Sequence, residues 1–257
     1  MSDDAKITYV GHATLLIEMD GVRLLTDPLL RQYIGHLRRR FPLPNDGLGS
    51  VDAVLISHLH GDHLDLPSLK RVGRDVRMII PKGAGPYLKV RRFRRVEEIE
   101  TGESIVVGGL RIEATRADHD GRQLPWVPWV EPLGYLIDGS HEIYFAGDTD
   151  LFPEMADIGQ KLDLALVPVW GWGPNLGKGH LDPFRAARAL EHLRPKAAIP
   201  IHWGTYSPVG LDLLRPKFLT RPPLDFAEHA AQLSPPVAVH VLQPGQSISL
   251  REMVPGV

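Results

Sequence analysis

The chain has 257 residues, with 12 histidines, no cysteine and a formal net charge of −2 at pH 7. Its length suits one large domain or at most two small ones. The absence of cysteine excludes disulfide scaffolds, thiolate zinc sites, iron–sulfur clusters and cysteine nucleophiles, so any metal site must use nitrogen and oxygen ligands. A net charge this close to zero gives no reason to expect a nucleic-acid partner.

The sequence carries no sign of a membrane or export segment. No stretch reaches the ~18 consecutive apolar residues of a membrane-spanning helix. Residues 1–4 (MSDD) lack the basic segment that begins a secretory signal. We therefore expect a cytoplasmic protein with no integral membrane segment, whereas its oligomeric state cannot be read from the sequence.

The first half of the chain alternates short apolar runs with turns. Strands are expected at 7–10, 14–19, 22–26, 51–57 and 76–80. The Asp20-Gly21 pair is a strong hairpin signal between the second and third of these strands. Residues 31–50 are predicted to form a loop, and the arginine run at 38–40 within it is either solvated or attracts an anionic substrate. Pro67 suits the first turn of a helix after a polar loop.

The second half is also rich in strands. They are expected at 104–107, 110–115, 133–137, 142–145, 162–167 and 197–201, with a closing hairpin from 237–242 and 247–250. Helices are expected at 83–90 and 225–233. The clearest helix begins at Asp182-Pro183, where the aspartate can cap and the proline fits the first turn. Its apolar face would contain Phe184, Ala187, Leu190 and Leu193. This pattern predicts an α/β fold of two sheets packed face to face with helices outside.

The densest group of candidate ligands directly follows the buried strand of the first half. The segment SHLHGDHLD contains His58, His60, Asp62 and His63. His58 and His60 share a face of an extended chain, and Gly61 permits the turn that brings the next two side chains to the same region. Imidazole and carboxylate groups suit zinc, manganese or iron. The group is larger than one four-coordinate ion with an open position needs, so it has room for two ions.

Three more candidate ligands each follow another apolar run. They are His119, Asp148 and His202. Taken alone, each would more often be an ordinary loop residue. Because the same pattern of an apolar run followed by a ligand-type residue occurs three times, we add all three to the candidate site.

The order of these residues resembles the metallo-β-lactamase superfamily. The pattern His58-x-His60-x-Asp62-His63, with the three later ligands, covers most of the chain. The segments VGHAT (10–14), LTDP (25–28), ISH (56–58), FAGDT (145–149), HLDP (180–183) and IHWGT (201–205) are similar to one branch. That branch contains N-acyl-phosphatidylethanolamine phospholipase D and, further off, the L-ascorbate-6-phosphate lactonases. The resemblance implies a single domain over residues 1–257 with a metallo-β-lactamase-like αβ/βα four-layer sandwich.

The resemblance also implies a dinuclear metal site with seven ligands between the strand ends of the two sheets. One ion would be bound by His58, His60 and His119, the other by Asp62, His63 and His202, with Asp148 bridging. A bridging hydroxide would then attack a phosphoryl or carbonyl centre while the two cations stabilise the charge that develops. Zinc is the default ion for such ligands, and manganese or iron fit them as well.

Several neighbouring residues have open roles. Asp62 could relay a proton as well as bind metal. His180 resembles a histidine near the site in this branch and could act as a general acid, or backbone groups could simply hold its ring. His12, Asp27 and Asp65 are expected to support the ligands or to cap. Four tryptophans in two loops could form an apolar wall for the substrate or pack as core: Trp126, Trp129, Trp170 and Trp172.

These features predict a metal-dependent hydrolase that acts on a phosphodiester. A lactone or ester hydrolase with the same site is the alternative, and a metal-binding module without catalytic activity is a third hypothesis. The segment between Asp148 and His202 is too short for the inserted domain of the nucleases in the superfamily. We therefore expect a small-molecule or lipid-derived substrate, which can be anionic, and no nucleic acid.

Overall fold

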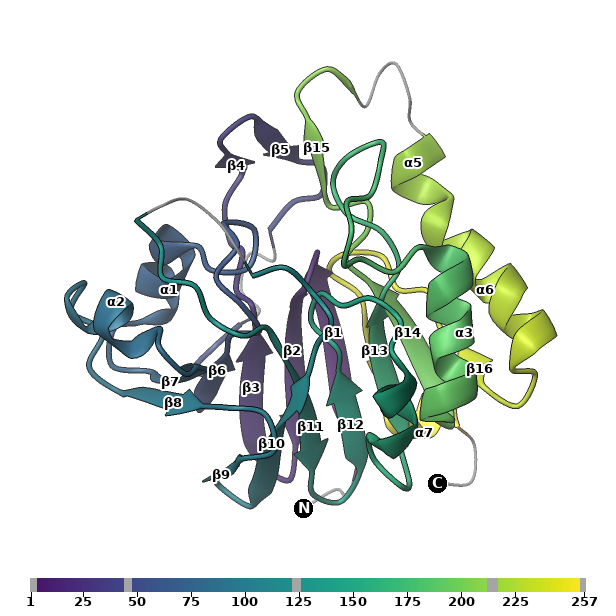
Figure 1. Cartoon of the computed structure of the whole chain (residues 1–257), viewed down its shortest axis with the longest axis horizontal. Coiled ribbons are helices and arrows are strands. Elements are labelled where there is room, and N and C mark those ends of the chain that lie inside the picture. The colour runs from purple at the N-terminus through teal and green to yellow at the C-terminus, as the bar shows by residue number, and fades with distance from the viewer. Residues whose placement is uncertain (1–3, 44–47, 122–125, 212–216, 255–257) are drawn as a thin grey trace.

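The computed structural model describes residues 4–43, 48–121, 126–211 and 217–254 (Figure 1). Two large sheets and one small sheet make up its β structure. The first sheet has the order β17 (Ser247–Ser249), β1 (Lys6–Gly11), β2 (Thr14–Met19), β3 (Val22–Thr26), β6 (Ala53–Leu55), β7 (Arg77–Pro81) and β8 (Val96–Ile99). The second has the order β16 (Ala238–Val239), β14 (Ala197–Ile201), β13 (Leu164–Pro168), β12 (Glu142–Phe145), β11 (Leu133–Asp138), β10 (Leu110–Arg116) and β9 (Ser104–Val107).

The helices lie on the two outer flanks. On one flank are α1 (Leu66–Val72) and α2 (Gly85–Lys89), and on the other are α3 (Pro183–Leu193) and α6 (Pro222–Leu233), as Figure 1 shows. Three further short helical segments lie in the described part of the chain: η1 (Pro153–Asp157), α5 (Lys217–Thr220) and α7 (Leu250–Met253). This arrangement confirms the predicted α/β sandwich with helices outside. Within the described ranges, no helix combines the length and the apolar character needed to cross a membrane.

Alternating side chains of the first sheet serve two separate cores. On β2, Leu15 and Ile17 belong to the core shared with the second sheet, whereas Leu16 packs in a second core with Leu69 of α1 and Leu88 of α2. This is the period of two that a strand imposes on its side chains. Within the predicted strand at 51–57, residues 53–56 are all apolar because both faces are covered in this way, although the paired part is only β6.

The direction of the strands creates one functional edge. Strands β3, β6, β7 and β8 are parallel to one another, and so are β12, β13 and β14. Strand β10 points the same way as β12, since both are antiparallel to β11. The carboxyl ends of β6, β10, β12 and β14 are the points from which the candidate ligands leave the sheets.

Local turn and cap signals are confirmed where the structure describes them. Asp20 and Gly21 both have positive φ, 52° and 78°, in the tight turn between β2 and β3. The Asp182 carboxylate accepts a hydrogen bond from the Arg185 backbone N–H at the start of α3. Asp65 caps α1 in the same way. These signals depend on residues within one turn of chain, so the sequence alone determines them.

The prediction of a loop over 31–50 is wrong in part. A small third sheet contains β4 (Tyr33–Ile34), β5 (Leu37–Arg39) and β15 (Tyr206–Pro208), at the end of the molecule opposite both termini (Figure 1). Such short strands carry no apolar alternation, and β5 is paired by a segment far along the chain. Residues 44–47 of the predicted loop, like 122–125 of the first tryptophan loop, lie outside the described residues.

Two other predictions are corrected. The segments expected to form a closing hairpin lie in different sheets: β16 pairs with β14, and β17 pairs with the free edge of β1. An apolar run at the end of a chain does not specify which edge it will complete. Phe184 is 48% exposed at the side of α3, with its ring edge towards His229 of α6, whereas Ala186, Ala189 and Leu190 are buried.

Candidate metal centre

The structure brings all seven predicted ligands together at one edge of the sandwich. The loop after β6 supplies the four residues of the HLHGDH segment, and the segments after β10, β12 and β14 supply the other three. Their ligand-type atoms form groups whose members all lie within 4.8 Å of one another. The groups are His12, Asp62, His63 and His202; His58, His60 and His119; His58, His63 and Asp148; and His119, Asp148 and His180.

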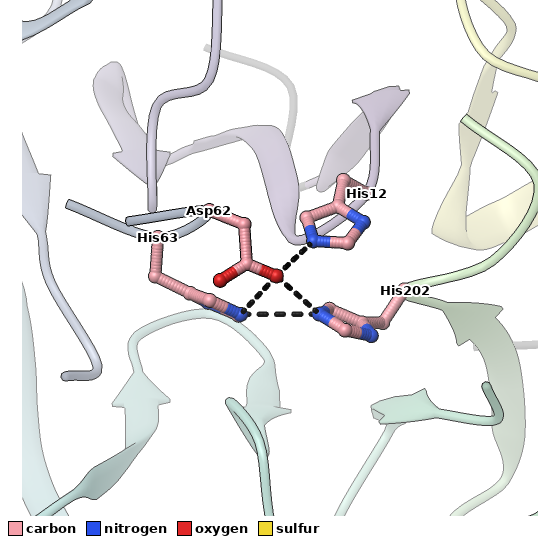
Figure 2. A group of neighbouring side chains, drawn as sticks. All are labelled: His12, Asp62, His63 and His202. Atoms are coloured by element: carbon pink, nitrogen blue, oxygen red, sulfur yellow. Dashed lines mark hydrogen bonds and ion pairs between the residues drawn. The ribbon is translucent and has the colours of Figure 1, made fainter. Parts of the chain in front are cut away.

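One half of the site is centred on the Asp62 carboxylate (Figure 2). Its Oδ2 atom lies 3.0 Å from His12 Nε2, 3.9 Å from His63 Nε2 and 3.8 Å from His202 Nε2. The two Nε2 atoms of His63 and His202 are 3.1 Å apart. The His12 ring also lies against the His202 ring, with centroids 3.8 Å apart. Four ligand-type side chains from three distant segments therefore point at one small volume.

The other half of the site consists of His58, His60 and His119. His60 Nδ1 lies 3.1 Å from His119 Nε2. The three rings form a nearly equilateral triangle, with the His58 centroid 4.5 Å from that of His60 and 4.8 Å from that of His119, and the last two 4.9 Å apart. His58 Nε2 is buried and has no hydrogen-bond partner among the described residues. An unpaired buried nitrogen of this kind is costly unless something else occupies its lone pair.

Asp148 lies between the two halves. Its Oδ2 is 3.2 Å from His63 Nε2 and 3.4 Å from His180 Nε2, and its Oδ1 is 3.3 Å from His202 Nε2. The Oδ1 atom is buried and has no hydrogen-bond partner among the described residues. Both His63 and His202 belong to the half centred on Asp62, but the groups within 4.8 Å also join Asp148 to His58 and to His119 of the other half, so its carboxylate is within reach of both halves.

Backbone carbonyls orient two of the imidazoles. His119 Nδ1 lies 2.7 Å from the Gly179 carbonyl oxygen, and His202 Nδ1 lies 2.8 Å from the Trp170 carbonyl oxygen. Because a carbonyl can only accept, each Nδ1 must carry the proton and donate it. The Nε2 lone pair of each ring is then available towards the site, which is the arrangement that metal-binding histidines use.

Side chains orient two further imidazoles. The Asp27 carboxylate lies 2.8 Å from His63 Nδ1 and accepts hydrogen bonds from the Ser57 hydroxyl, at 2.5 Å, and the Ser57 backbone N–H, at 2.7 Å. Since the Ser57 hydroxyl donates to Asp27, its oxygen accepts from His58 Nδ1, 3.0 Å away. His58 therefore presents an Nε2 lone pair to the site, and His63 does so once the proton favoured by Asp148 and Asp62 has left. Asp27 has the supporting position that the sequence indicated.

The protonation states of the cluster also suit a metal. Burial lowers the pKa of His58 and of His119, and it lowers the pKa of His202 to about 3, so these three rings are neutral at pH 7. Burial raises the pKa of the Asp62 and Asp148 carboxyls, but neighbouring histidines outweigh it and hold both values well below the usual range. Neutral imidazoles and ionised carboxylates are the forms that bind cations.

The donor set therefore fits divalent metal ions. Ligand atoms about 2.0–2.1 Å from a tetrahedral ion lie about 3.3 Å apart, close to the 3.1 Å separations within each half. Two buried ligand atoms without partners and four rings with fixed tautomers support the same conclusion. The clusters can hold metal, and every donor is nitrogen or oxygen.

Some functional groups escaped the sequence analysis. The carbonyl groups of Gly179 and Trp170 carry no sequence signal, because every residue has a carbonyl. His12, expected only as a support, lies close enough to Asp62 to belong to a potential ligand group. The available sequence signal was its position directly after the predicted strand at 7–10. The structure adds a φ of 59°, which is uncommon outside glycine.

Of the four tryptophans in the two loops, Trp170 and Trp172 pack within the protein, whereas Trp126 and Trp129 are exposed. Trp170 donates from Nε1 to the Gly173 carbonyl, and Trp172 packs against the His36 ring at 5.4 Å. Trp126 and Trp129 are exposed, and Trp129 lines an open cleft next to His119. The expectation of tryptophans bordering the site is therefore met at Trp129.

Sequence comparison gives the family. A family model described as "Beta-lactamase superfamily domain" matches residues 22–203. The chain belongs to this superfamily. It is 34% identical over 203 residues to a UPF0173 protein of Pyrococcus furiosus, covering 79% of this chain and 85% of that protein. It is 32% identical over 250 residues to a UPF0173 metal-dependent hydrolase of Methanopyrus kandleri, covering 94% and 98%.

Two further relatives bear on the chemistry. An N-acyl-phosphatidylethanolamine-hydrolyzing phospholipase D of Caenorhabditis elegans is 30% identical over 235 residues, covering 79% of this chain and 64% of that protein. Among solved structures, Igni18, a metallo hydrolase of Ignicoccus hospitalis, has a TM-score of 0.72 at 25% identity, covering 96% of this chain and 98% of that one. With the His/Asp clusters, these relationships identify the protein as a metal-dependent hydrolase.

The raised pKa of His63 predicts that rising pH has opposite effects on the stability of the metal-free protein and on metal binding. Burial lowers its pKa, but Asp148 and Asp62 outweigh this and raise it well above 6.5. Protonated His63 therefore stabilises the folded, metal-free protein. This contribution is fully present below the ordinary pKa of histidine and is lost as the pH rises through the raised pKa of the folded state. Metal binding must displace that proton, so metal affinity should rise with pH.

Thermal unfolding of protein treated with a chelator and of zinc-loaded protein, from about pH 6 to about pH 9, measures this response. We expect the unfolding temperature of the metal-free protein to fall over this range and the stabilisation by zinc to grow. A metal-free protein that becomes more stable as the pH rises would show that His63 is not the proton-binding group.

Proposed function

We propose that the protein is a dinuclear phosphodiester hydrolase. In this proposal His58, His60 and His119 bind one divalent ion, and Asp62, His63 and His202 bind the other. Asp148 bridges the two ions. Zinc is the expected metal for this donor set, with manganese or iron as alternatives. The supporting observation is the position of Asp148, which contacts His63 and His202 of one half and also shares groups within 4.8 Å with His58 and His119 of the other half.

Bound ions would supply a hydroxide nucleophile at neutral pH and would stabilise negative charge on the substrate. The other requirement of the reaction is a proton for the leaving alkoxide, and His180 has the position to provide it. Its Nδ1 faces the Lys178 carbonyl at 3.1 Å, so its Nε2 faces Asp148 at 3.4 Å. Burial lowers the pKa of His180, but the Asp148 carboxylate outweighs this and raises it.

Asp62 is assigned a ligand role in this proposal. Its lowered pKa makes the carboxylate a weak base, which suits metal binding better than the proton relay that the sequence left open. His12 would hold this carboxylate in place through the contact of its Nε2 with Oδ2. An Asp62→Asn variant that kept both metals but lost turnover would support a relay instead.

The choice of a phosphodiester over a lactone rests on the phospholipase D relative. The experiment that tests it combines metal analysis with turnover of zinc-, manganese- and iron-loaded protein on a model phosphodiester, a lactone and an aryl ester. Two ions per chain and hydrolysis of the phosphodiester at the highest kcat/KM support the proposal. Turnover of the lactone or ester alone would contradict the phosphodiester reaction but not the metal site. Full metal occupancy without turnover of any substrate would indicate a metal-binding module without catalytic activity.

We expect His180→Gln to retain both metal ions and to lower kcat about 10²- to 10⁴-fold on a substrate with an alkoxide leaving group. A nitrophenolate leaving group needs no proton, so the loss on that substrate should be much smaller. Metal analysis and the two rate ratios measure the effect. Equal losses on both substrates, or a lost metal ion, would mean that His180 acts on the metal site and not on the leaving group.

A further inference from the structure

The loop between β13 and α3 turns its backbone towards the metal centre. Within residues 170–179 of this loop, three carbonyl oxygens face the Nδ1 atoms of three different imidazoles of the site. The pairs are Trp170 with His202 at 2.8 Å, Lys178 with His180 at 3.1 Å and Gly179 with His119 at 2.7 Å. This one segment, the 170–179 loop, therefore contacts a proposed ligand from each half of the site and the proposed acid.

Gly179 makes the shortest of these contacts, and a side chain at its position would obstruct it. Gly179 has a φ of 76°, in the left-handed region that residues with a Cβ rarely adopt. A Cβ added there would lie 3.1 Å from His119 Nδ1 and 3.2 Å from His119 Cα. A Cβ at Gly177 would lie 3.8 Å from His180 Nδ1, which is an ordinary van der Waals distance. The approach of the backbone to the imidazole therefore requires glycine at 179 and not at 177.

The chain that carries His119 is itself held by backbone hydrogen bonds. The Asp118 N–H donates to Thr149 Oγ1 at 2.9 Å, and the Asp118 carbonyl accepts from the Asp150 N–H at 2.8 Å. A side chain at 179 would therefore be accommodated by a shift of the 170–179 loop or by rotation of the His119 ring. Either change lengthens the hydrogen bond from His119 Nδ1–H to the Gly179 carbonyl.

This hydrogen bond decides which ring nitrogen of His119 is free to bind metal. A neutral imidazole has two tautomers, and the one present is set by the partner of the protonated nitrogen. Only the Nδ1–H tautomer satisfies the Gly179 carbonyl, and it leaves the Nε2 lone pair in the site, 3.1 Å from His60 Nδ1. Without the carbonyl contact, both the tautomer and the direction of the ring would lose their constraint.

We infer that Gly179 is a positioning residue for the metal centre: because it lacks a side chain, its carbonyl reaches His119 Nδ1 and fixes the tautomer and orientation in which His119 Nε2 binds an ion. The inference rests on the proposed function for the ion at His119, whereas the tautomer can be measured on metal-free protein. Gly179→Ala and Gly179→Val form a graded pair of tests, since a β-branched residue tolerates a positive φ least.

Long-range ¹H–¹⁵N NMR of metal-free protein with ¹⁵N-labelled histidine reports which ring nitrogen carries the proton. The spectrum of His119→Gln identifies the His119 signals by their absence. We expect the Nδ1–H form of His119 to predominate in the wild-type protein, and this predominance to be lost in Gly179→Ala and more completely in Gly179→Val. A wild-type His119 in the Nε2–H form, or an unchanged Nδ1–H form in both variants, would overturn the inference.

Zinc titration against a competing chelator measures the consequence for metal binding. We expect Gly179→Ala to lower the affinity for one ion per chain about 10- to 100-fold, and Gly179→Val to lower it further. The absorption bands of cobalt-loaded protein should change with it, because they report the ligand geometry around the ion. Unchanged zinc affinity in both variants contradicts the inference. A wild-type protein that binds fewer than two ions contradicts the dinuclear proposal, and the tautomer measurement then decides the role of Gly179 by itself.

Two glycines elsewhere are matched controls. Gly173 lies in the same loop without a positive φ, and a Cβ there comes no closer than 3.4 Å, to the Asn175 carbonyl oxygen. Gly173→Ala should therefore keep the His119 tautomer and the zinc affinity. Gly108 has a φ of 59°, and a Cβ there would lie 2.5 Å from Val22 Cγ2, in the turn at the amino end of β10.

Gly108→Ala thus introduces comparable strain at the end of β10 opposite the one that leads to His119. We expect it to lower the unfolding temperature of the metal-free protein and to leave the His119 tautomer and the zinc affinity unchanged. A loss of zinc affinity in Gly108→Ala as large as that in Gly179→Ala would show that lost stability explains both, and the positioning role would be refuted.

Discussion

Replacing Asp148 with asparagine is expected to lower kcat/KM by more than about 100-fold and to remove at least one metal ion per chain. Mutation of a group that only orients a metal ligand lowers metal affinity or activity about 10- to 100-fold. A larger effect is expected for Asp148, because it is proposed as a ligand to both ions. An amide keeps the shape but loses the charge that faces His63, His202 and His180 within 3.4 Å. Metal analysis and steady-state kinetics measure both effects.

Asp163→Asn is a matched control for this variant. Asp163 is also largely buried, and its carboxylate accepts from the Glu142 backbone N–H and pairs with Lys196, away from the metal centre. This control should lose stability and keep its metals and its kcat/KM. An Asp148→Asn protein that bound two ions and turned over normally would refute a bridging role.

Arg39→Met is expected to destabilise the protein by about 3 kcal/mol or more. The Arg39 guanidinium is 2% exposed and donates to the carbonyl oxygens of Val10, Leu29 and Phe41. Methionine fills a similar volume but leaves the buried carbonyls of Val10 and Leu29 without these donors, each at a cost of about 1–3 kcal/mol, and removes a further donor from the half-buried Phe41 carbonyl. For a chain of this size the unfolding temperature should fall by roughly 6–12 °C.

Arg39 also links the small third sheet to the metal centre. Arg39 lies on β5, and its hydrogen-bond partner Val10 immediately precedes the Gly11-His12 loop. The guanidinium packs closely against this loop, since a Cβ added to Gly11 would lie only 3.0 Å from it. We therefore expect weaker zinc binding as well as lower stability. Arg40→Met is the control, because Arg40 is exposed, and it should change stability by less than about 0.5 kcal/mol. Equal effects of the two substitutions would contradict the role of Arg39.

The position of Arg39 corrects the interpretation of the arginine run at 38–40. Taken as a run, it suggested a solvated or anion-binding cluster. In the structure Arg39, the middle residue of the run, is buried and donates hydrogen bonds to carbonyl oxygens. Its Cζ atom lies 5.7 Å from the ring centroid of Tyr206 on β15. Adjacent residues of a strand point to opposite sides, so a run of like charges on β5 cannot be a single patch.

Local sequence patterns determined most of the sandwich and all seven candidate ligands. A hairpin at Asp20-Gly21 or a cap at Asp182 needs only the residues of one turn, so a short window of sequence contains the cause. The candidate ligands could be predicted because four of them share one polar loop after a buried strand and the other three each follow another apolar run. The parallel order of the strands then requires their carboxyl ends to meet at one edge.

Tertiary structure alone decided the features that depend on a distant partner. The strand that completes the first sheet, the third sheet and the burial of Arg39 each require a segment far along the chain, which residue types near the position do not specify. The same holds within the site. The carbonyl groups of Gly179 and Trp170 select the ring tautomers of His119 and His202, and a backbone carbonyl has no sequence signature because every residue has one.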